Sequence, residues 1–292
     1  MIRVLLIFSL VLITACSSGH KKAEVKSPYV DRAQTLTRAG IDAMQRGSWS
    51  YAENAFARAL TAAQLADNTL LVIRAWYNLG VAHLANGHTP EGVAALHQAE
   101  TLSLRHHDQA NALRAHLQLA LMGEMPESGQ QIEPEANMPA DIHLLAGKLA
   151  HRQGFADLAS REFGKVLARK ADTAPELLTD AQAHFGLAMV AKDLGERDAA
   201  INEAEKALAL ARKVGAPRLN AHVLLFLADL DLTDGERGDY LERSLVIYKA
   251  LKDERGQRAC LERLMGTAKQ QGNSDRVAEY AEALRLLGQT KE

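Results

Sequence analysis

Most of the chain consists of short segments in which apolar residues recur every three or four positions, with polar turns between them. From Trp76 to Leu84, for example, apolar side chains occupy positions i, i+3 and i+8, and the small Gly80 occupies i+4. Such spacing places an apolar stripe along one face of an α-helix. The pattern predicts helices over residues 30–46, 49–65, 70–86, 90–105, 109–123, 140–153, 156–170, 175–194, 197–213, 218–233, 237–251, 255–271 and 274–288.

Glycines follow many of these helices and recur at regular distances. The turn glycines are Gly47, Gly87, Gly154, Gly195, Gly235 and Gly272, with intervals of 40, 67, 41, 40 and 37 residues. Glycine is favoured just beyond a helix C-terminus because it adopts the left-handed conformation at little cost. The spacing predicts an internal repeat of about 40 residues, and the long interval holds one repeat plus most of another.

The repeats resemble the tetratricopeptide repeat. Its first helix, Trp-x2-Leu-Gly-x2-Tyr, is matched by Trp76, Leu79 and Gly80, with His83 in place of the tyrosine. Its turn glycine and second helix, Ala-x3-Phe-x2-Ala, are matched by Gly47, Ala52, Phe56 and Ala59, with Trp49 in the turn between them. Later repeats depart from the motif, since Ser244 and Ala281 replace the phenylalanine and Asp231 replaces the tyrosine.

The resemblance implies an all-α fold. This fold is an α-solenoid in which antiparallel helix pairs stack into a right-handed superhelix over residues 31–288. Because the period exceeds the roughly 34 residues usual for the family, we expect longer helices than is standard. Trp49 and Trp76 occupy positions at which the motif packs repeats together, so we expect both in the core.

One stretch, from Glu124 to Pro139, interrupts this rhythm. It contains three prolines and almost no apolar face, and structureless loops of this length are uncommon. We interpret it as the remnant of a decayed helix, or alternatively as a partner-docking or hinge loop. It divides the predicted array into an N-terminal block over 30–123 and a C-terminal block over 140–288.

The N-terminus has the pattern of a secretory signal. Arg3 precedes an apolar run over 4–15 that is too short to span a bilayer. The run ends in the letters LITAC at 12–16, which resemble the bacterial lipobox. An ordinary cleaved signal or an uncleaved anchor is the alternative interpretation.

The lipobox resemblance implies a signal peptide over 1–15 and lipidation of Cys16. Several acyl chains on one residue would give a stable anchor, whereas a single chain binds membranes only marginally. The polar residues 16–29 are then a flexible tether. Because residue 17 is Ser rather than Asp, the sorting rule of Gram-negative lipoproteins implies attachment to the outer membrane, facing the periplasm.

Composition argues against several classes of protein. The 34 Lys and Arg residues nearly balance the 36 Asp and Glu residues, whereas proteins that bind nucleic acids usually carry a basic surplus. Two cysteines cannot form a disulfide framework. One of them, Cys260, lies on a predicted helix, where we expect a buried apolar residue.

No catalytic motif is present in the sequence. The phosphate-binding loop, the dinucleotide-binding glycine pattern and the nucleophile elbow are all absent. The 11 histidines include no His-Glu-x-x-His motif and no Cys/His group with zinc spacing. We therefore expect no metal, no cofactor and no enzymatic activity. We interpret His83 as a packed histidine, with a ligand as the alternative, and residues 106–108 as solvated surface, with a metal site as the alternative.

The first helices of a tetratricopeptide array line its concave groove, where ligands of the family bind. Carrying the groove positions of the family onto this chain nominates partner-binding residues Arg38, Arg74, Tyr77, Asn78, Arg114, Gln118, Lys148, Phe185, Met189, His222, Phe226, Asp229 and Arg263. The family's ligands are extended peptides or helices.

Three of these candidates, Arg38, Arg74 and Arg114, occupy corresponding levels of successive repeats. A guanidinium binds a carboxylate through two hydrogen bonds, so the set predicts an acidic ligand or a C-terminal carboxylate, with plain exposed helix charges as the alternative. Asn78 matches one residue of the carboxylate clamp of some family members, but Thr37 and Ile41 replace its lysine and asparagine.

A second group of candidates is apolar and consists of Phe185, Met189 and Phe226. It is either an anchor pocket for a ligand or packing between repeats.

The leading hypothesis is a lipid-anchored scaffold or adaptor that binds a peptide or helix of another envelope protein. It resembles the outer-membrane tetratricopeptide lipoproteins of pilus, envelope-protein or peptidoglycan machinery. Repeats near 40 residues also resemble those of ligand-responsive bacterial regulators, so a sensor is the alternative. An enzyme subunit is the third possibility.

Overall fold

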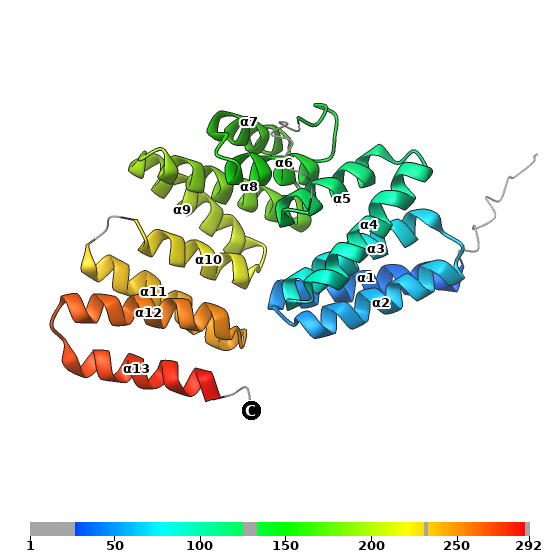
Figure 1. Ribbon diagram of the computed structural model, residues 1–292. Helices are drawn as coiled ribbons and strands as arrows, with labels where there is room; N and C mark the ends of the chain where they lie inside the picture. The colour runs from blue at the N-terminus through cyan, green and yellow to red at the C-terminus, as the bar shows by residue number, and fades with distance from the viewer. Residues whose placement is uncertain (1–26, 125–132, 231–232, 290–292) are drawn as a thin grey trace, which may run out of the picture.

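The computed structural model describes residues 27–124, 133–230 and 233–289, and every regular element in these ranges is an α-helix (Figure 1). The helices are α1 (Pro28–Arg46), α2 (Trp49–Leu65), α3 (Thr69–Asn86), α4 (Thr89–Arg105), α5 (Gln109–Met122), α6 (Ala140–Arg152), α7 (Ala156–Leu167), α8 (Ala174–Asp193), α9 (Arg197–Lys213), α10 (Pro217–Ala228), α11 (Asp234–Ala250), α12 (Glu254–Gln270) and α13 (Ser274–Gln289). Each predicted helix is present, and the predicted helical solenoid is confirmed.

Several sequence-based expectations fall outside the described residues. These are the signal peptide over 1–15, the lipidation site Cys16, most of the tether, residues 125–132 of the proline-rich stretch, and Asp231. No helix among the described residues is long and apolar enough to cross a membrane.

Most of the turn glycines act as the sequence predicts. Gly47 and Gly87, for example, have φ of 74° and 88° and end α1 and α3 in the left-handed conformation. The expectation for Gly235 was wrong, because this residue lies inside the first turn of α11. There the Thr233 side chain accepts a hydrogen bond from the backbone of Glu236, whose carboxylate accepts one from the backbone of Thr233. This capping box starts α11 before the glycine is reached.

Within a helix pair, a large side chain of the second helix packs against a glycine of the first. Phe163 on α7 is fully buried, and its ring lies so close to Gly147 of α6 that a Cβ there would be only 2.6 Å from a ring carbon. The same ring meets Gly186 of α8, where a Cβ would come within 2.4 Å. One aromatic ring thus fills the space between three helices. Phe56 and Gly40 repeat the arrangement in the first pair.

Between α5 and α6, the described residues 123–124 and 133–139 form no helix. Leu117 of α5 is buried in one cluster with Ile142, Leu145 and Leu149 of α6. Helices α5 and α6 therefore pack directly on each other. The division into two blocks, which the sequence places at 124–139, remains a prediction.

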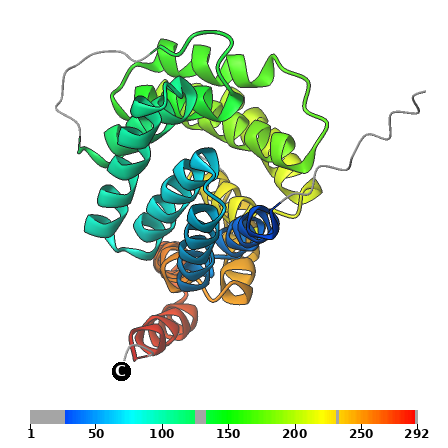
Figure 2. The same cartoon turned by 90° about the vertical axis from the view of Figure 1, so that its right-hand side faces the viewer.

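The helices curve round so that the beginning of the array meets its later part (Figure 2). Helix α1 contacts α10, and the indole of Trp49 lies under the guanidinium of Arg218, whose central carbon is 4.3 Å from the ring centroid. Trp49 is half-buried rather than in the core, where the sequence places it, and its contact with Arg218 joins distant repeats. Trp76, also half-buried, packs against the core cluster that contains Phe56 and Leu79.

Candidate binding site

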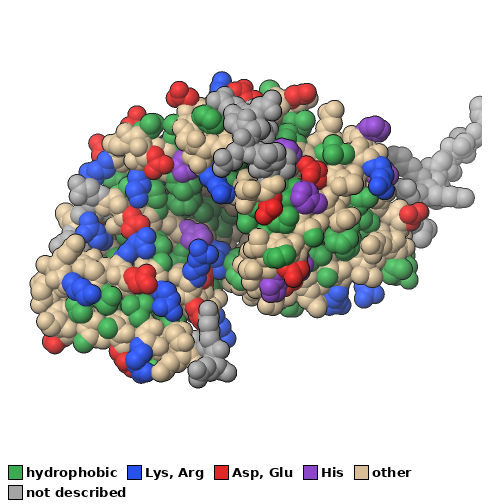
Figure 3. All heavy atoms as spheres, in the orientation of Figure 1, with side chains coloured by type: hydrophobic (Ala, Val, Ile, Leu, Met, Phe, Trp, Pro, Cys, Tyr) green, Lys and Arg blue, Asp and Glu red, His purple; other side chains and the backbone are tan. Residues whose placement is uncertain are grey.

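A cavity of about 750 Å³ lies inside this superhelical turn. Its walls come from α1, α3 and α5 on one side and from the start of α8 and the end of α9 on the other. Figure 3 shows the molecule hollowed in its middle, with hydrophobic side chains in the recess and Lys, Arg and His side chains at its edge. We call the cavity the basic pocket, because three arginines line it.

Five of the residues nominated from the sequence meet in the basic pocket. They are Arg38, Arg74, Tyr77, Asn78 and Arg114. They come together because α1, α3 and α5 are the successive first helices of the array, and residues at similar levels of these helices face the same space. The positions predicted for the groove of the N-terminal repeats therefore do lie on one concave surface.

Arg114 is already neutralised by another residue of the pocket. Its guanidinium donates two hydrogen bonds to the carboxylate of Asp141, one of them 3.0 Å long from Nη2 to Oδ1, and a third to the side-chain oxygen of Asn111. Burial disfavours the charge, but the hydrogen bond and the attraction of Asp141 outweigh it and raise the pKa of Arg114. Arg114 therefore connects α5 to α6 at the pocket, and its charge is paired with the carboxylate of Asp141.

Arg38 and Arg74 differ from Arg114 in exposure and in pairing. Both side chains are exposed, and among the described residues no carboxylate forms an ion pair with either of them. Asp42 lines the same pocket. These two arginines are the cations that remain available to a ligand.

The remaining lining of the pocket combines apolar side chains with polar ones such as Gln34, Gln45 and Asn111. Ile41, an exposed large hydrophobic residue, faces the pocket from α1, and Pro175 and Leu178 face it from α8. Tyr77 is half-buried beside them, and burial raises the pKa of its hydroxyl above the ordinary value. The phenol is therefore neutral at physiological pH and can donate a hydrogen bond.

The other nominated residues lie away from the basic pocket, and several have partners. Asp229 and Arg263 form a two-point ion pair with distances of 2.6 and 2.9 Å. Phe185 and Phe226 meet edge to face, with centroids 5.4 Å apart, and both pack on the core between α8 and α10. This contact gives the two phenylalanines a role in packing between repeats.

Gln118, Lys148, Met189 and His222 are also outside the pocket. All except His222 are half-buried. His222 is exposed and lies 5.8 Å from the ring of Tyr248, and its pKa is lowered by desolvation and by the charge of Arg218. Burial lowers the pKa of Lys148 to about 8. The structure thus does not gather the C-terminal candidates into one site.

Sequence comparison agrees with this repeat geometry. The sequence profile of the tetratricopeptide repeat matches residues 181–214, which cover most of α8 and all of α9. Residues 181–214 thus form a tetratricopeptide repeat, within a chain that has the helical-repeat fold of that family. A search of curated protein sequences finds no match.

Solved structures resemble the tetratricopeptide array in fold at low sequence identity. The apo form of the quorum sensor NprR from B. thuringiensis aligns with a TM-score of 0.57 and 13% identity, over 89% of this chain and 77% of its own. BtubC from P. vanneervenii aligns with a TM-score of 0.48 and 14% identity, over 89% and 91% of the two chains. The apo form of RapI aligns with a TM-score of 0.44 and 11% identity, over 91% of this chain and 86% of its own.

Two neighbouring tetratricopeptide repeats share a polar triad that motif matching missed. In α6 and α7, Nδ1 of His143 lies 2.7 Å from Oε2 of Glu162, and the other carboxylate oxygen, Oε1, pairs with Nζ of Lys165 at 2.5 Å. In α8 and α9 the same contacts recur 41 residues later, where Glu203 pairs with His184 and with Lys206, each at 2.6 Å. The first triad has a fully buried His–Glu pair, whereas in the second both side chains are 19% exposed. The triad ties the two helices of each pair together.

Proposed function

We propose that this tetratricopeptide protein is an adaptor that binds an acidic segment, or a C-terminal carboxylate, of a partner protein in the basic pocket. The observation that carries the proposal is that Arg38 and Arg74 line the pocket without an ion-pair partner among the described residues. The tetratricopeptide fold itself supports a role in protein interaction or in sensing.

The chemistry of the pocket favours a ligand that is acidic at one point and apolar at another. Each free guanidinium offers paired donors that match a carboxylate. The apolar surface of Ile41 and Leu178 can then cover an aliphatic side chain next to that carboxylate. A volume of about 750 Å³ lies within the range of sites that hold compact ligands or a few residues of a peptide.

We further propose that the protein works at the cell envelope. The lipobox resemblance at 12–16 supports lipidation of Cys16, and Ser17 supports sorting to the outer membrane of a Gram-negative host. The partner is then an envelope protein of pilus, envelope-protein or peptidoglycan machinery. In a Cys16→Ser variant we expect the protein to leave the membrane fraction, and a variant that stays embedded would contradict the acyl anchor.

A second candidate function is that of a ligand-responsive sensor. The resemblance in fold to the quorum sensor NprR supports it, as does a pocket enclosed between the first helices of a curved array and its middle helices, α8 and α9. A sensor would change its curvature when the ligand binds, whereas an adaptor would keep its shape. Small-angle scattering with and without a bound peptide distinguishes the two functions.

The binding proposal can be tested with defined peptides. We would screen a library of acidic heptapeptides, each with a free and an amidated C-terminus, for binding to the full chain by fluorescence anisotropy. Hydrogen bonds to charged groups contribute about 1.5–3 kcal/mol each, so we expect Arg38→Glu and Arg74→Glu each to weaken the best peptide at least tenfold.

The matched control carries the same charge change elsewhere. Arg58→Glu and Arg105→Glu alter exposed arginines that do not line the pocket, and we expect them to bind the peptide like the parent chain. If the control variants lost as much affinity for the peptide as the pocket variants, the effect would be one of general charge, and the pocket would be rejected as the binding site.

A further inference from the structure

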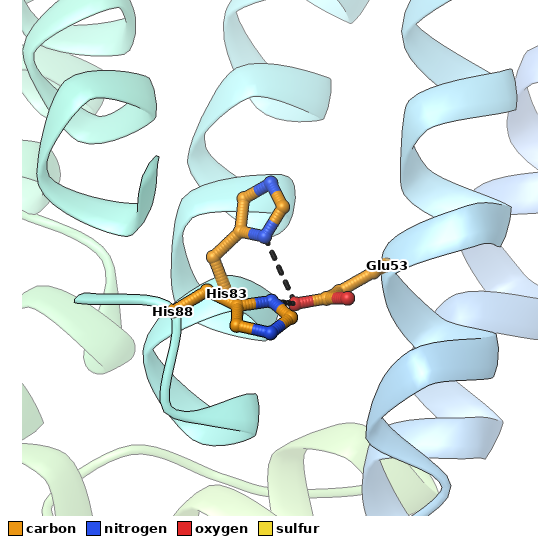
Figure 4. A group of neighbouring side chains, drawn as sticks. All are labelled: Glu53, His83 and His88. Atoms are coloured by element: carbon orange, nitrogen blue, oxygen red, sulfur yellow. Dashed lines mark hydrogen bonds and ion pairs between the residues drawn. The ribbon is translucent and has the colours of Figure 1, made fainter. Parts of the chain in front are cut away.

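Three potential metal ligands meet at the first two repeats, outside the basic pocket. They are Glu53 of α2, His83 of α3, and His88 in the turn before α4 (Figure 4). Nδ1 of His83 lies 2.9 Å and Nδ1 of His88 lies 2.8 Å from the same carboxylate oxygen, Oε1 of Glu53. All three donor atoms lie within 4.8 Å of one another.

The fold itself brings these residues together. Gly87, with φ of 88°, reverses the chain after α3, and the turn returns His88 to the end of the helix that carries His83. Helix α2 packs along α3 and presents Glu53 to both rings. Asn86 then donates a hydrogen bond of 3.0 Å to the other oxygen of Glu53, Oε2, and so fixes the orientation of the carboxylate.

The carboxylate at the centre of this group is ionised and sheltered. Its side chain is 14% exposed, against 21% for His83 and 52% for His88. Burial alone raises the pKa of Glu53, but the hydrogen bonds from His83, His88 and Asn86 lower it below the ordinary value. A negative oxygen with two imidazole nitrogens within 3 Å requires either a proton on each nitrogen or a cation among them.

We propose that Glu53, His83 and His88 bind a divalent transition-metal ion, with Zn²⁺ as the best fit. Two imidazole nitrogens and one carboxylate are a common zinc ligand set, and the fourth position is left to water. Zn–N and Zn–O bonds of about 2.0–2.2 Å need only small side-chain shifts from the present distances. The hydrogen bond from Asn86 orients the carboxylate of Glu53, as hydrogen-bond partners of metal ligands commonly do.

Metal binding uses the lone pair of Nδ1 in each ring, so the ring proton resides on Nε2 in the bound form. An imidazole nitrogen binds a metal ion only when it carries no proton, so protons and zinc compete for the same two nitrogen atoms. The bound ion would fasten α2 to the turn between α3 and α4.

Isothermal titration with zinc chloride tests the site. The full chain, purified in mild detergent and stripped of metal with a chelator, is expected to bind one equivalent at this site with a Kd below about 10 μM. His83→Gln and His88→Gln keep polar side chains in place and should remove this equivalent. Asn86→Ala, which alters only the outer partner, should weaken it about tenfold to a hundredfold.

The control is His106→Gln combined with His107→Gln, at two exposed neighbouring histidines, which should leave the binding unchanged. Circular dichroism of each variant checks that the helices are intact. A parent chain that takes up no zinc, or a His83→Gln or His88→Gln chain that takes up as much as the parent, would overturn the proposal.

Discussion

The guanidinium of Arg218 on α10 lies over the indole ring of Trp49 at the start of α2 and joins the first repeat to a distant one. Nη2 of Arg218 also pairs with Asp253 at 2.7 Å. A Cβ on Gly47 would lie 2.6 Å from this same nitrogen, so the glycine leaves the guanidinium its space. These residues close the superhelical turn around the basic pocket.

We expect Arg218→Ala to open this turn. A cation over an aromatic ring contributes about 0.5–2 kcal/mol, and the substitution also removes the ion pair between Arg218 and Asp253. Small-angle scattering should show a larger radius of gyration than that of the parent. The control is Arg243→Ala, since Arg243 contacts Tyr240 within its own helix, and an equal expansion there would argue against the closing role of Arg218.

The two repeated polar triads provide a stability test with a built-in comparison. Removal of one partner from a buried ion pair costs about 3–5 kcal/mol, because the other is left unpaired. We therefore expect Glu162→Ala to lower the free energy of unfolding by about 3 kcal/mol. At the partly exposed triad, Glu203→Ala should cost less, about 1 kcal/mol. Urea unfolding measures both, and equal costs would contradict the assigned difference in burial.

Lys148 predicts a specific dependence of stability on pH. Burial lowers its pKa to about 8 from the ordinary 10.5, so between these values the unfolded chain holds a proton that the folded chain has released. Stability contributed by this group therefore rises as the pH increases from 8 to 10.5. Lys148→Met should flatten that rise and be more stable than the parent at pH 7.

Urea unfolding of both chains across this pH range provides the measurement. Lys269→Met, at an exposed position, serves as control and should keep the parental slope. A Lys148→Met chain with the same slope as the parent would show that the lysine is fully solvated.

Replacement of two glycines near Phe163 by alanine should change the stability of the protein in opposite directions. Gly147→Ala places a Cβ 2.6 Å from the buried ring, and such overpacking usually costs about 1–3 kcal/mol. Gly164 lies on α7 with nothing within 4 Å of an added Cβ, so Gly164→Ala should stabilise the helix by about 0.5–1 kcal/mol. Thermal unfolding compares the stabilities of the two variants. If Gly147→Ala left the stability unchanged, the ring of Phe163 would be free to move.

Local sequence patterns predicted the helices and the face that their residues share. Apolar spacing and turn glycines are features of neighbouring residues in the chain. The positions of Arg38 and Arg74 along their helices follow from the same local features. The error at Gly235 has the same local origin. The glycine there predicted a turn, but the capping box of Thr233 and Glu236 starts α11 at Asp234, just before this glycine.

What the sequence did not predict depends on contacts between distant segments. Arg114 was counted as a free cation because its partner Asp141 lies beyond the proline-rich stretch, and only the packing of α5 on α6 brings them together. The cluster of Glu53, His83 and His88 combines residues from two helices and a turn, with no spacing typical of a zinc motif. Neither arrangement leaves a signal within one repeat.

The contact between Trp49 and Arg218 also bears on kinetics. If the basic pocket binds a long polypeptide, we expect entry either along the superhelical axis or sideways, after α1 and α10 separate. On the sideways route, entry and escape both wait for the stacked pair to part. The lifetime of such a complex would then be governed by how often the ring of helices opens, and a partner held by few contacts could still remain for long.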